Sequence, residues 1–320
     1  MKDNPQYLPR YAGIPTFMRC PYTDQYDDLD IALIGVPFDG GVTNRTGARH
    51  GPREVRNQSS LMRTINQSTG VAPFDICNVA DVGDAVPDNP FELVAGHNSI
   101  EQFVKGVVDK GVMPISVGGD HSVTLPILRA LAKDGPVALV HFDAHCDTGD
   151  DYLGSKFHHG SPFKIAAEEG LIDPKKTIQI GIRGSVTDRE IWKFSYESGM
   201  RVIHMEEFYD LGVKNIIKEI HELVGDTPAY ITFDVDSLDP VYAPGTGTPE
   251  IGGYTTLEAQ LMIRGLKGLN IIGGDVVEVA PAFDHGSITS LTGASMLFEI
   301  LCVAAESIDS KRKAEADAHV

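Results

Sequence analysis

The segment VALVHFDAHCD, residues 137–147, begins as a buried strand and ends in a row of polar side chains. Its first part is continuously apolar, which is typical of a strand whose two faces are both covered by helices, as in parallel α/β sheets. Its end places Asp143, His145 and Asp147 at alternate positions, where a buried strand normally carries apolar residues. Two acids and an imidazole at one strand end therefore indicate a functional site.

Seven other segments repeat this strand pattern, and stretches with helical periodicity lie between them. The regular alternation predicts a mostly parallel α/β fold, namely a three-layer α/β/α domain with an eight-stranded, mainly parallel sheet. A closed eight-stranded barrel also fits the count. The expected strands are 30–37, 75–82, 113–118, 137–143, 177–183, 201–205, 229–236 and 270–279.

No linker, internal repeat or low-complexity segment divides the 320 residues, and 42% of them are hydrophobic, as in ordinary globular proteins. We therefore expect one domain over residues 1–320. Within it, residues 1–29 form an N-terminal extension that packs on the domain or on a neighbouring subunit. Residues 310–320, which are almost entirely polar or alanine, are expected to be a frayed tail.

The charge and the apolar pattern exclude several classes of partner. The net charge of −18 disfavours nucleic acids and anionic membranes, which both require basic patches. No apolar run that could cross a membrane is apparent, and the N-terminus has no signal-peptide core. The four cysteines are widely spaced, which indicates free thiols. The expected location is the cytoplasm.

Polar side chains also interrupt three other expected strands or follow them. Ligands of open parallel sheets bind at the carboxyl edge, so these side chains are expected to meet those of residues 143–147. They are His121, after a Gly-Gly turn that follows strand 113–118, Asp234 and Asp236 at the end of strand 229–236, and Glu278 in strand 270–279.

Two imidazoles and four carboxylates at one edge suit a pair of divalent metals. Without metal, four clustered aspartates would repel one another in a desolvated cleft, whereas two divalent cations would cancel their charge. Oxygen-rich ligands without a thiolate favour manganese over structural zinc, and nickel or cobalt would suit the same set. Cys146 points the other way on an extended segment and is not counted. The expected ligands are His121, Asp143, His145, Asp147, Asp234 and Asp236.

Three segments with these residues resemble the signature segments of the ureohydrolase family, which includes arginase, agmatinase and the guanidino-acid hydrolases. They are GGDHS at 118–122, FDAHCD at 142–147 and FDVDSLDPVYAPGTGTPEIGG at 233–253. The resemblance extends over nearly the whole chain. Residues 10–19, 35–41 and 43–56 are similar to the agmatinase branch, and the whole pattern is closest to guanidino-acid hydrolases, especially those acting on guanidinopropionate.

The resemblance implies a binuclear metal site and a hydrolase of linear amidines, cleaving C–N bonds other than peptide bonds. One manganese ion would be held by His121, Asp143, Asp147 and Asp234, and the other by Asp143, His145, Asp234 and Asp236. Two such ions activate a water that attacks the guanidinium carbon, releasing urea and an amine. Relatives form trimers or hexamers, so a homo-oligomer is expected.

The resemblance also implies catalytic roles for three residues. Glu278 would receive the guanidinium group, His159 would move the proton that the leaving amine needs, and Asp147 would steady the attacking water. The neighbouring His158 is a less favoured candidate for the proton-moving role. Cys146 departs from the family pattern and is expected to make the enzyme sensitive to oxidation.

The loop GDDYLGSK, residues 149–156, is expected to select the other half of the guanidino substrate. Tyr152 or Lys156 would bind the carboxylate of a guanidino acid such as 3-guanidinopropionate or 4-guanidinobutyrate, which is the favoured substrate class. Asp150 and Asp151 would instead attract the ammonium end of agmatine, the alternative substrate. A zinc deacetylase would lack the paired Asp234 and Asp236, and a catalytically inactive binding homologue would be expected to have lost ligands.

Overall fold

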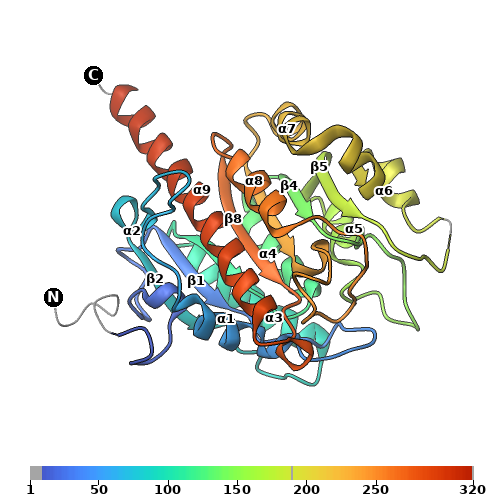
Figure 1. The fold of residues 1–320 in the computed structure, drawn as a ribbon, viewed down its shortest axis with the longest axis horizontal. Coiled ribbons are helices and arrows are strands. Elements are labelled where there is room, and N and C mark those ends of the chain that lie inside the picture. Colours follow the sequence, from blue (N-terminus) through green and yellow to red (C-terminus); the bar gives the residue numbers. More distant parts are fainter. Residues whose placement is uncertain (1–8, 189, 319–320) are drawn as a thin grey trace.

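The computed structural model describes residues 9–188 and 190–318. Across these residues, eight strands form one sheet in the order β2-β1-β3-β8-β7-β4-β5-β6, and every pairing is parallel (Figure 1). The strands are β1 (Ile31–Gly35), β2 (Val79–Asp84), β3 (Met113–Val117), β4 (Val137–Phe142), β5 (Ile172–Ile182), β6 (Arg201–His204), β7 (Ala229–Asp234) and β8 (Ile271–Val277). The expected open α/β sheet is thus confirmed, because β2 and β6 lie at opposite edges and do not close a barrel.

Helices cover both faces of the sheet. They are α1 (Gly51–Ser59), α2 (Pro73–Ile76), α3 (Leu93–Val108), α4 (Thr124–Leu131), α5 (Pro162–Glu168), α6 (Lys193–Ser198), α7 (Met205–Val224), α8 (Thr256–Gly265) and α9 (Ile288–Ala318). The strand expected at 75–82 begins later, because Pro73 occupies the first position of α2 and favours a helical start there. β5 begins earlier than expected, at Ile172.

Side chains alternate along the strands between two apolar layers. Ile31 and Leu33 of β1 face a layer to which α1, α7, α8 and α9 contribute, whereas Ala32 and Ile34 face one built with α3, α4 and α5. Since successive residues of a strand point to opposite faces, a strand covered on both sides must be continuously apolar. This arrangement is the three-layer α/β/α architecture.

The C-terminal helix α9 differs from two expectations, one about membrane-spanning segments and one about the end of the chain. By length and composition it could cross a membrane, but 83% of its most apolar window is buried inside the protein, as in a core helix. Residues 310–318, expected to be frayed, continue this helix beyond the body of the protein (Figure 1). They are rich in helix-forming Ala, Lys and Glu, and Lys313 pairs with Asp309 one turn earlier at 2.6 Å.

Part of the expected N-terminal extension packs on the domain. The side chains of Phe17, Met18 and Cys20 are buried in the apolar layer beside α1. The backbone N–H of Phe17 donates to Asp81 of β2 at 3.0 Å, and that of Met18 donates to Ser59 of α1 at 2.8 Å. Residues 1–8 of the extension lie outside the described residues.

Candidate metal centre

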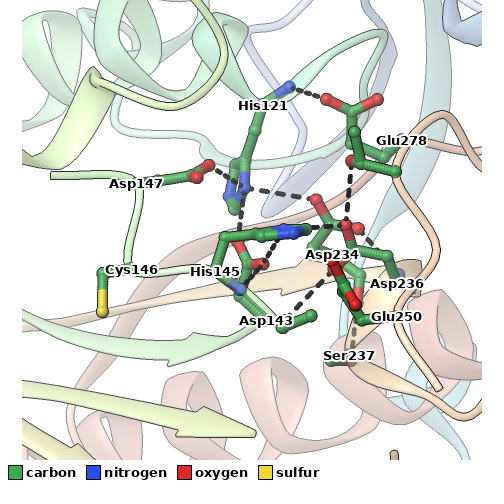
Figure 2. A network of polar contacts seen from close by, with 12 residues as sticks. His121, Asp143, His145, Cys146, Asp147, Asp234, Asp236, Ser237, Glu250 and Glu278 are labelled. Atoms are coloured by element: carbon green, nitrogen blue, oxygen red, sulfur yellow. Dashed lines mark hydrogen bonds and ion pairs between the residues drawn. The ribbon is translucent and has the colours of Figure 1, made fainter. Parts of the chain in front are cut away.

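The polar side chains expected at the carboxyl edge come from four strands that are neighbours in the sheet. The central strands follow one another in the order β3-β8-β7-β4. His121 follows β3, Glu278 follows β8, Asp234 ends β7 and Asp143 follows β4. Segments far apart in the chain therefore meet at one edge, and Figure 2 shows their side chains converging.

The Gly-Gly turn places His121 by allowing the backbone to approach another loop. A Cβ atom on Gly119 would lie 1.5 Å from the carbonyl oxygen of Phe38, so no larger residue fits there. The following amide, of Asp120, donates to the same carbonyl at 2.9 Å, and the Asp120 carboxylate then accepts from the N–H of Ser122 at 2.8 Å. The short turn that begins at His121 is thereby fixed.

One imidazole nitrogen is surrounded by the first set of expected ligands. Nδ1 of the fully buried His121 lies 3.0 Å from an oxygen of Asp143, 3.0 Å from one of Asp147 and 3.4 Å from one of Asp234. Despite these short distances, Nδ1 makes no hydrogen bond of acceptable geometry. A nitrogen and three carboxylate oxygens that converge without hydrogen bonding are the donor set of a cation.

The second imidazole, of His145, lies close to two of the other expected ligands, Asp143 and Asp236, whereas Asp234 lies near His121. Nδ1 of His145 lies 3.3 Å from Oδ1 of Asp143 and 3.1 Å from Oδ2 of Asp236. Asp143 turns its Oδ2 towards His121, so its two oxygens serve the two groups separately. This is the geometry of a carboxylate that bridges two ions.

The carboxylates are electrostatically strained without cations. Burial and the charges of Asp236 and Asp143 raise the pKa of Asp234 well above its usual value. Burial also raises the pKa of Asp236, although His145 opposes it. Burial acts in the same direction on Asp143, but the surrounding histidines outweigh it and hold the pKa of this carboxyl well below its usual value. Two divalent cations would relieve this repulsion, so the residues fit a binuclear site.

Two buried chains of hydrogen bonds orient the expected ligands. Nε2 of His121 lies 2.8 Å from the hydroxyl of Thr232, which donates to Asp275 at 2.7 Å. That hydroxyl is therefore free to accept from Nε2–H, which leaves Nδ1 with its lone pair for a metal. Asp275 also accepts hydrogen bonds from the hydroxyls of Thr124 and Tyr230, both at 2.8 Å.

The second chain involves two residues that the sequence reasoning did not assign. The amide of Gln179 donates to Nδ1 of His141 at 3.2 Å, and Nε2 of His141 lies 2.7 Å from Oδ2 of Asp143. His141 stands two residues before Asp143 in the same strand, and this spacing was the available sequence signal. His141 thus holds one oxygen of the bridging carboxylate in place.

Two acids of the site have backbone conformations that are unusual for residues other than glycine. The φ angles of Asp147 and Glu278 are 51° and 63°. Such left-handed conformations cost free energy and concentrate at functional sites. In Glu278, Oε1 accepts hydrogen bonds from the backbone N–H of His121 and from Nδ1 of His159, both at 2.9 Å.

His159 is nearly buried beside Glu278, at 9% exposure. Burial lowers the pKa of His159, but the hydrogen bond and charge of Glu278, with the charges of Asp120 and Asp147, outweigh it and raise the pKa to about 9. Its neighbour His158 is engaged with the backbone: its Nε2 lies 2.8 Å from the carbonyl of Asp150, and its Nδ1 accepts from the N–H of Gly160 at 3.2 Å. Both ring nitrogens of His158 are thus engaged with the backbone, which favours His159 for the proton-moving role, although His158 also lines the cavity described next.

A cavity of about 760 Å³ opens over the metal centre. One wall is the expected loop, from which Asp150, Asp151 and Tyr152 line the cavity but Lys156 does not. Residues 185–188 and 190–194 also line the cavity, and they were not anticipated from the sequence because no motif marks this segment. Among these lining residues, Tyr152 is 48% exposed.

The loop carries an ion pair that changes its expected charge. Asp150, which was expected to attract an ammonium group, is paired with Lys164 on α5. The Lys164 side chain is 23% exposed, lines the cavity, and has its Nζ 5.4 Å from the centre of the Phe194 ring. Asp150 is thus neutralised by a cation that the sequence reasoning missed.

Cys146 faces away from the ligands, as expected (Figure 2). Its side chain packs with Ile182, Val202 and Trp192. Burial raises the pKa of the Cys146 thiol, which disfavours the reactive thiolate. The predicted sensitivity to oxidation is therefore not favoured by this environment.

Comparison with known protein sequences agrees with the resemblance to the ureohydrolase family. The sequence model of the arginase family matches residues 29–303. The chain is 56% identical to guanidinopropionase of Pseudomonas aeruginosa over 95% of this chain and 98% of that protein. It is 47% identical to guanidinobutyrase of the same species, over 92% of this chain and 94% of that one. Identity to mitochondrial agmatinase of Gallus gallus is 48%, over 93% and 88% of the two chains.

The fold is also found among solved structures. Proclavaminate amidino hydrolase from Streptomyces clavuligerus superposes with a TM-score of 0.90 at 39% identity, covering 94% of this chain and all of that one. An agmatinase described as hypothetical, from Burkholderia thailandensis, superposes with a TM-score of 0.86 at 38% identity, covering 96% and 94% of the two chains.

Proposed function

The chain belongs to the arginase family, and we propose that it hydrolyses a guanidino acid, 3-guanidinopropionate or 4-guanidinobutyrate, to urea and an amine. The enzyme is an amidinohydrolase, a hydrolase of linear amidines. The observation that carries the proposal is the pair of histidine-centred ligand groups joined by Asp143, which open onto a cavity beside Glu278 and His159.

The proposed ligands are those expected from the sequence, and each of the remaining site residues has a role in handling the substrate. When bound, the two ions supply a water that is nucleophilic at neutral pH. The Glu278 carboxylate binds the planar guanidinium through paired hydrogen bonds and fixes its orientation. Asp147 accepts a hydrogen bond from the attacking water. His159 gives the proton on Nδ1 to the amine nitrogen as the C–N bond breaks, since an unprotonated amine leaves poorly.

A carboxylate substrate requires a cation or hydrogen-bond donors at the far end of the cavity. Three Lys or Arg side chains line it among the described residues: Lys164, Arg183 and Lys193. Arg183 donates to five backbone carbonyls and is committed to the fold. Lys193 is more than half exposed and pairs with Glu190. Lys164 and the Tyr152 hydroxyl are therefore the proposed partners of the substrate carboxylate.

Agmatine is the second candidate substrate, and the acids of the cavity favour it. Asp151, Asp188 and Glu197 line the cavity, and a cationic tail would be attracted to them. Agmatinase relatives share nearly half of the sequence. The identity to guanidinopropionase and the neutralisation of Asp150 by Lys164 favour the guanidino acid.

The test is urea release by the manganese-loaded protein with agmatine, 3-guanidinopropionate, 4-guanidinobutyrate, arginine and guanidine. We expect the highest kcat/KM with one of the two guanidino acids. Preference for agmatine would assign selection to the acids of the cavity. Absence of urea from every compound, with both metal positions filled, would instead support the inactive binding homologue and reject the proposed reaction.

Manganese as the native metal, assembly into trimers or hexamers and a cytoplasmic location remain proposals. The oxygen-rich ligand set supports manganese, with nickel or cobalt as substitutes. Metal analysis of protein purified without added metal tests the identity of the metal, and sedimentation velocity tests the oligomeric state. Fractionation of cells that produce the protein tests the cytoplasmic location.

A further inference from the structure

Thr43 contacts the side of His159 that faces away from Glu278. The Thr43 hydroxyl lies 2.9 Å from Nε2 of His159, and the Thr43 backbone N–H lies 3.3 Å from the same nitrogen. The opposite nitrogen, Nδ1, lies 2.9 Å from Oε1 of Glu278. The imidazole is therefore held at both of its nitrogens, by an exposed loop on one side and by a buried carboxylate on the other.

The same loop also holds the backbone of His159. The carbonyl of Gly41 accepts from the N–H of His159 at 2.9 Å, and the N–H of Gly41 donates to the buried carboxylate of Asp120 at 2.7 Å. Farther along the loop, Nε of Arg45 donates to the carbonyl of Gly247 at 2.8 Å. Thr43 thus lies between two fixed points of the loop, which makes it a rigid partner for the ring.

A hydroxyl suits both protonation states of an imidazole. It accepts a hydrogen bond when Nε2 carries a proton and donates one when Nε2 has a lone pair. Because His159 gains and loses its proton at Nδ1, Nε2 keeps its own proton and the Thr43 hydroxyl remains its acceptor throughout. Without this contact, a half-turn of the ring about the Cβ–Cγ bond would exchange Nδ1 with a ring carbon and break the hydrogen bond between Nδ1 and Glu278. The charged groups around this ring are Glu278, Asp120 and Asp147.

We propose that Thr43 is a positioning residue that keeps Nδ1 of His159 directed towards Glu278, where the guanidinium binds, and so preserves His159 as the acid for the leaving amine. This inference rests on the proposed function, because it assigns a partner to the residue that protonates the amine. In the step concerned, the proton leaves Nδ1 for the amine nitrogen, which retains the electron pair of the broken C–N bond. The ring becomes neutral, and Thr43 continues to bind Nε2.

The test compares Thr43→Val, which keeps the shape but removes the hydroxyl, with Thr43→Ser, which keeps the hydroxyl. Two substrates are used: 3-guanidinopropionate and its oxyguanidine analogue, whose alkoxyamine product is far less basic and leaves without a strong acid. Because a positioned acid contributes about 10² to 10⁴ in rate, we expect Thr43→Val to lower kcat for the guanidino acid about tenfold or more. The oxyguanidine rate should change little, and Thr43→Ser should restore most of the lost rate.

A purely structural role would slow both substrates alike, and that result would overturn the inference. The metal content of Thr43→Val, measured by mass spectrometry, should equal that of the wild type. In a His159→Phe background, Thr43→Val should cause no further loss, because the two residues act as a unit. Wild-type kcat in Thr43→Val would also reject the inference while leaving the proposed function intact, whereas absence of urea from the wild type would reject the proposed function itself.

Discussion

Nδ1 of His159 and Oε1 of Glu278 share a hydrogen bond of 2.9 Å, so the proposed acid and the proposed guanidinium partner are directly coupled. Replacing Glu278→Gln should lower kcat/KM about 10- to 100-fold, because a charge-assisted pair with the substrate is lost. It should also lower the pKa of His159 from about 9, since Glu278 is the main group that raises it. Kinetics of urea release measure the first effect. Glu190→Gln, on the cavity wall, is the control, and equal kinetics in the two variants would contradict the assignment.

The two oxygens of Asp143 face different histidines, which predicts unequal consequences for two metal-ligand variants. Asp143→Ala should lose both ions, because it removes an oxygen from each group. Asp236→Ala should retain the ion near His121, because Asp236 pairs with His145, the imidazole of the other ligand group. Metal content after dialysis, measured by mass spectrometry, checks this, and two ions bound to Asp143→Ala would refute the bridging role.

Lys164 is proposed to bind the substrate carboxylate. Lys164→Met should raise KM for 3-guanidinopropionate about tenfold, because a charge-assisted hydrogen bond contributes about 1.5–3 kcal/mol. KM for ethylguanidine, which has no carboxylate, should stay unchanged. Lys193→Met is the matched control on the same cavity. An equal rise for both substrates would show that Lys164 acts through the structure of the loop.

Replacement of Gly119 or Gly106 by alanine should change the free energy of unfolding in opposite directions. Gly119→Ala places a Cβ 1.5 Å from the Phe38 carbonyl, so the turn before His121 must move. We expect a loss of about 3 kcal/mol or more in the free energy of unfolding. Gly106 lies on the exposed side of the last turn of α3 with open space around its Cβ, and alanine there should stabilise by about 0.5 kcal/mol. Urea denaturation measures both, and similar effects of the two variants would contradict the close approach.

His97 should make folding stability sensitive to acid. Burial, with a small contribution from Arg129, lowers the pKa of His97 to about 4. Because this lies below the unfolded value of about 6.5, the unfolded chain binds more protons and stability falls as the pH drops from about 6.5 towards 4. The expected loss is about 1.4 kcal/mol at pH 5.5 relative to pH 8.

The matched variant for this effect is His97→Gln, which keeps a partner for the Ser122 hydroxyl 3.0 Å from Nε2. Urea denaturation with a chelator present removes metal binding from the comparison. The difference in the free energy of unfolding between wild type and variant should change by about 1.4 kcal/mol between pH 8 and pH 5.5. A constant difference would mean that His97 does not titrate in this range.

The strands and the site edge could be predicted because their signals are local. A continuously apolar run reports burial on both faces, and Asp143, His145 and Asp147 interrupt it within a few residues. Sheet order brought the four segments together, and the rule that ligands bind at the carboxyl edge anticipated that meeting. Residues 310–318 were expected to be frayed because their composition is polar. Their helix-forming side chains instead continue α9.

The supporting residues were missed because their function depends on contacts across the chain. Thr43 meets His159 from 116 positions away, and Lys164 meets Asp150 only through the folding of the loop. Gln179 reaches His141 from a neighbouring strand. An alternating pattern identifies ligands on one strand, but it does not contain the register between strands that selects their hydrogen-bond partners.

The assembly of the site from four neighbouring strands also links metal supply to the lifetime of the protein. The unfolded chain cannot gather ligands from segments as distant as His121 and Asp236, so the ions bind almost only to the folded state. At a free metal concentration 100 times the dissociation constant, one such site adds about 2.7 kcal/mol to the free energy of unfolding. A cell short of metal would hold a less stable protein, which proteases would remove sooner, so that the amount of enzyme would follow the metal available to it.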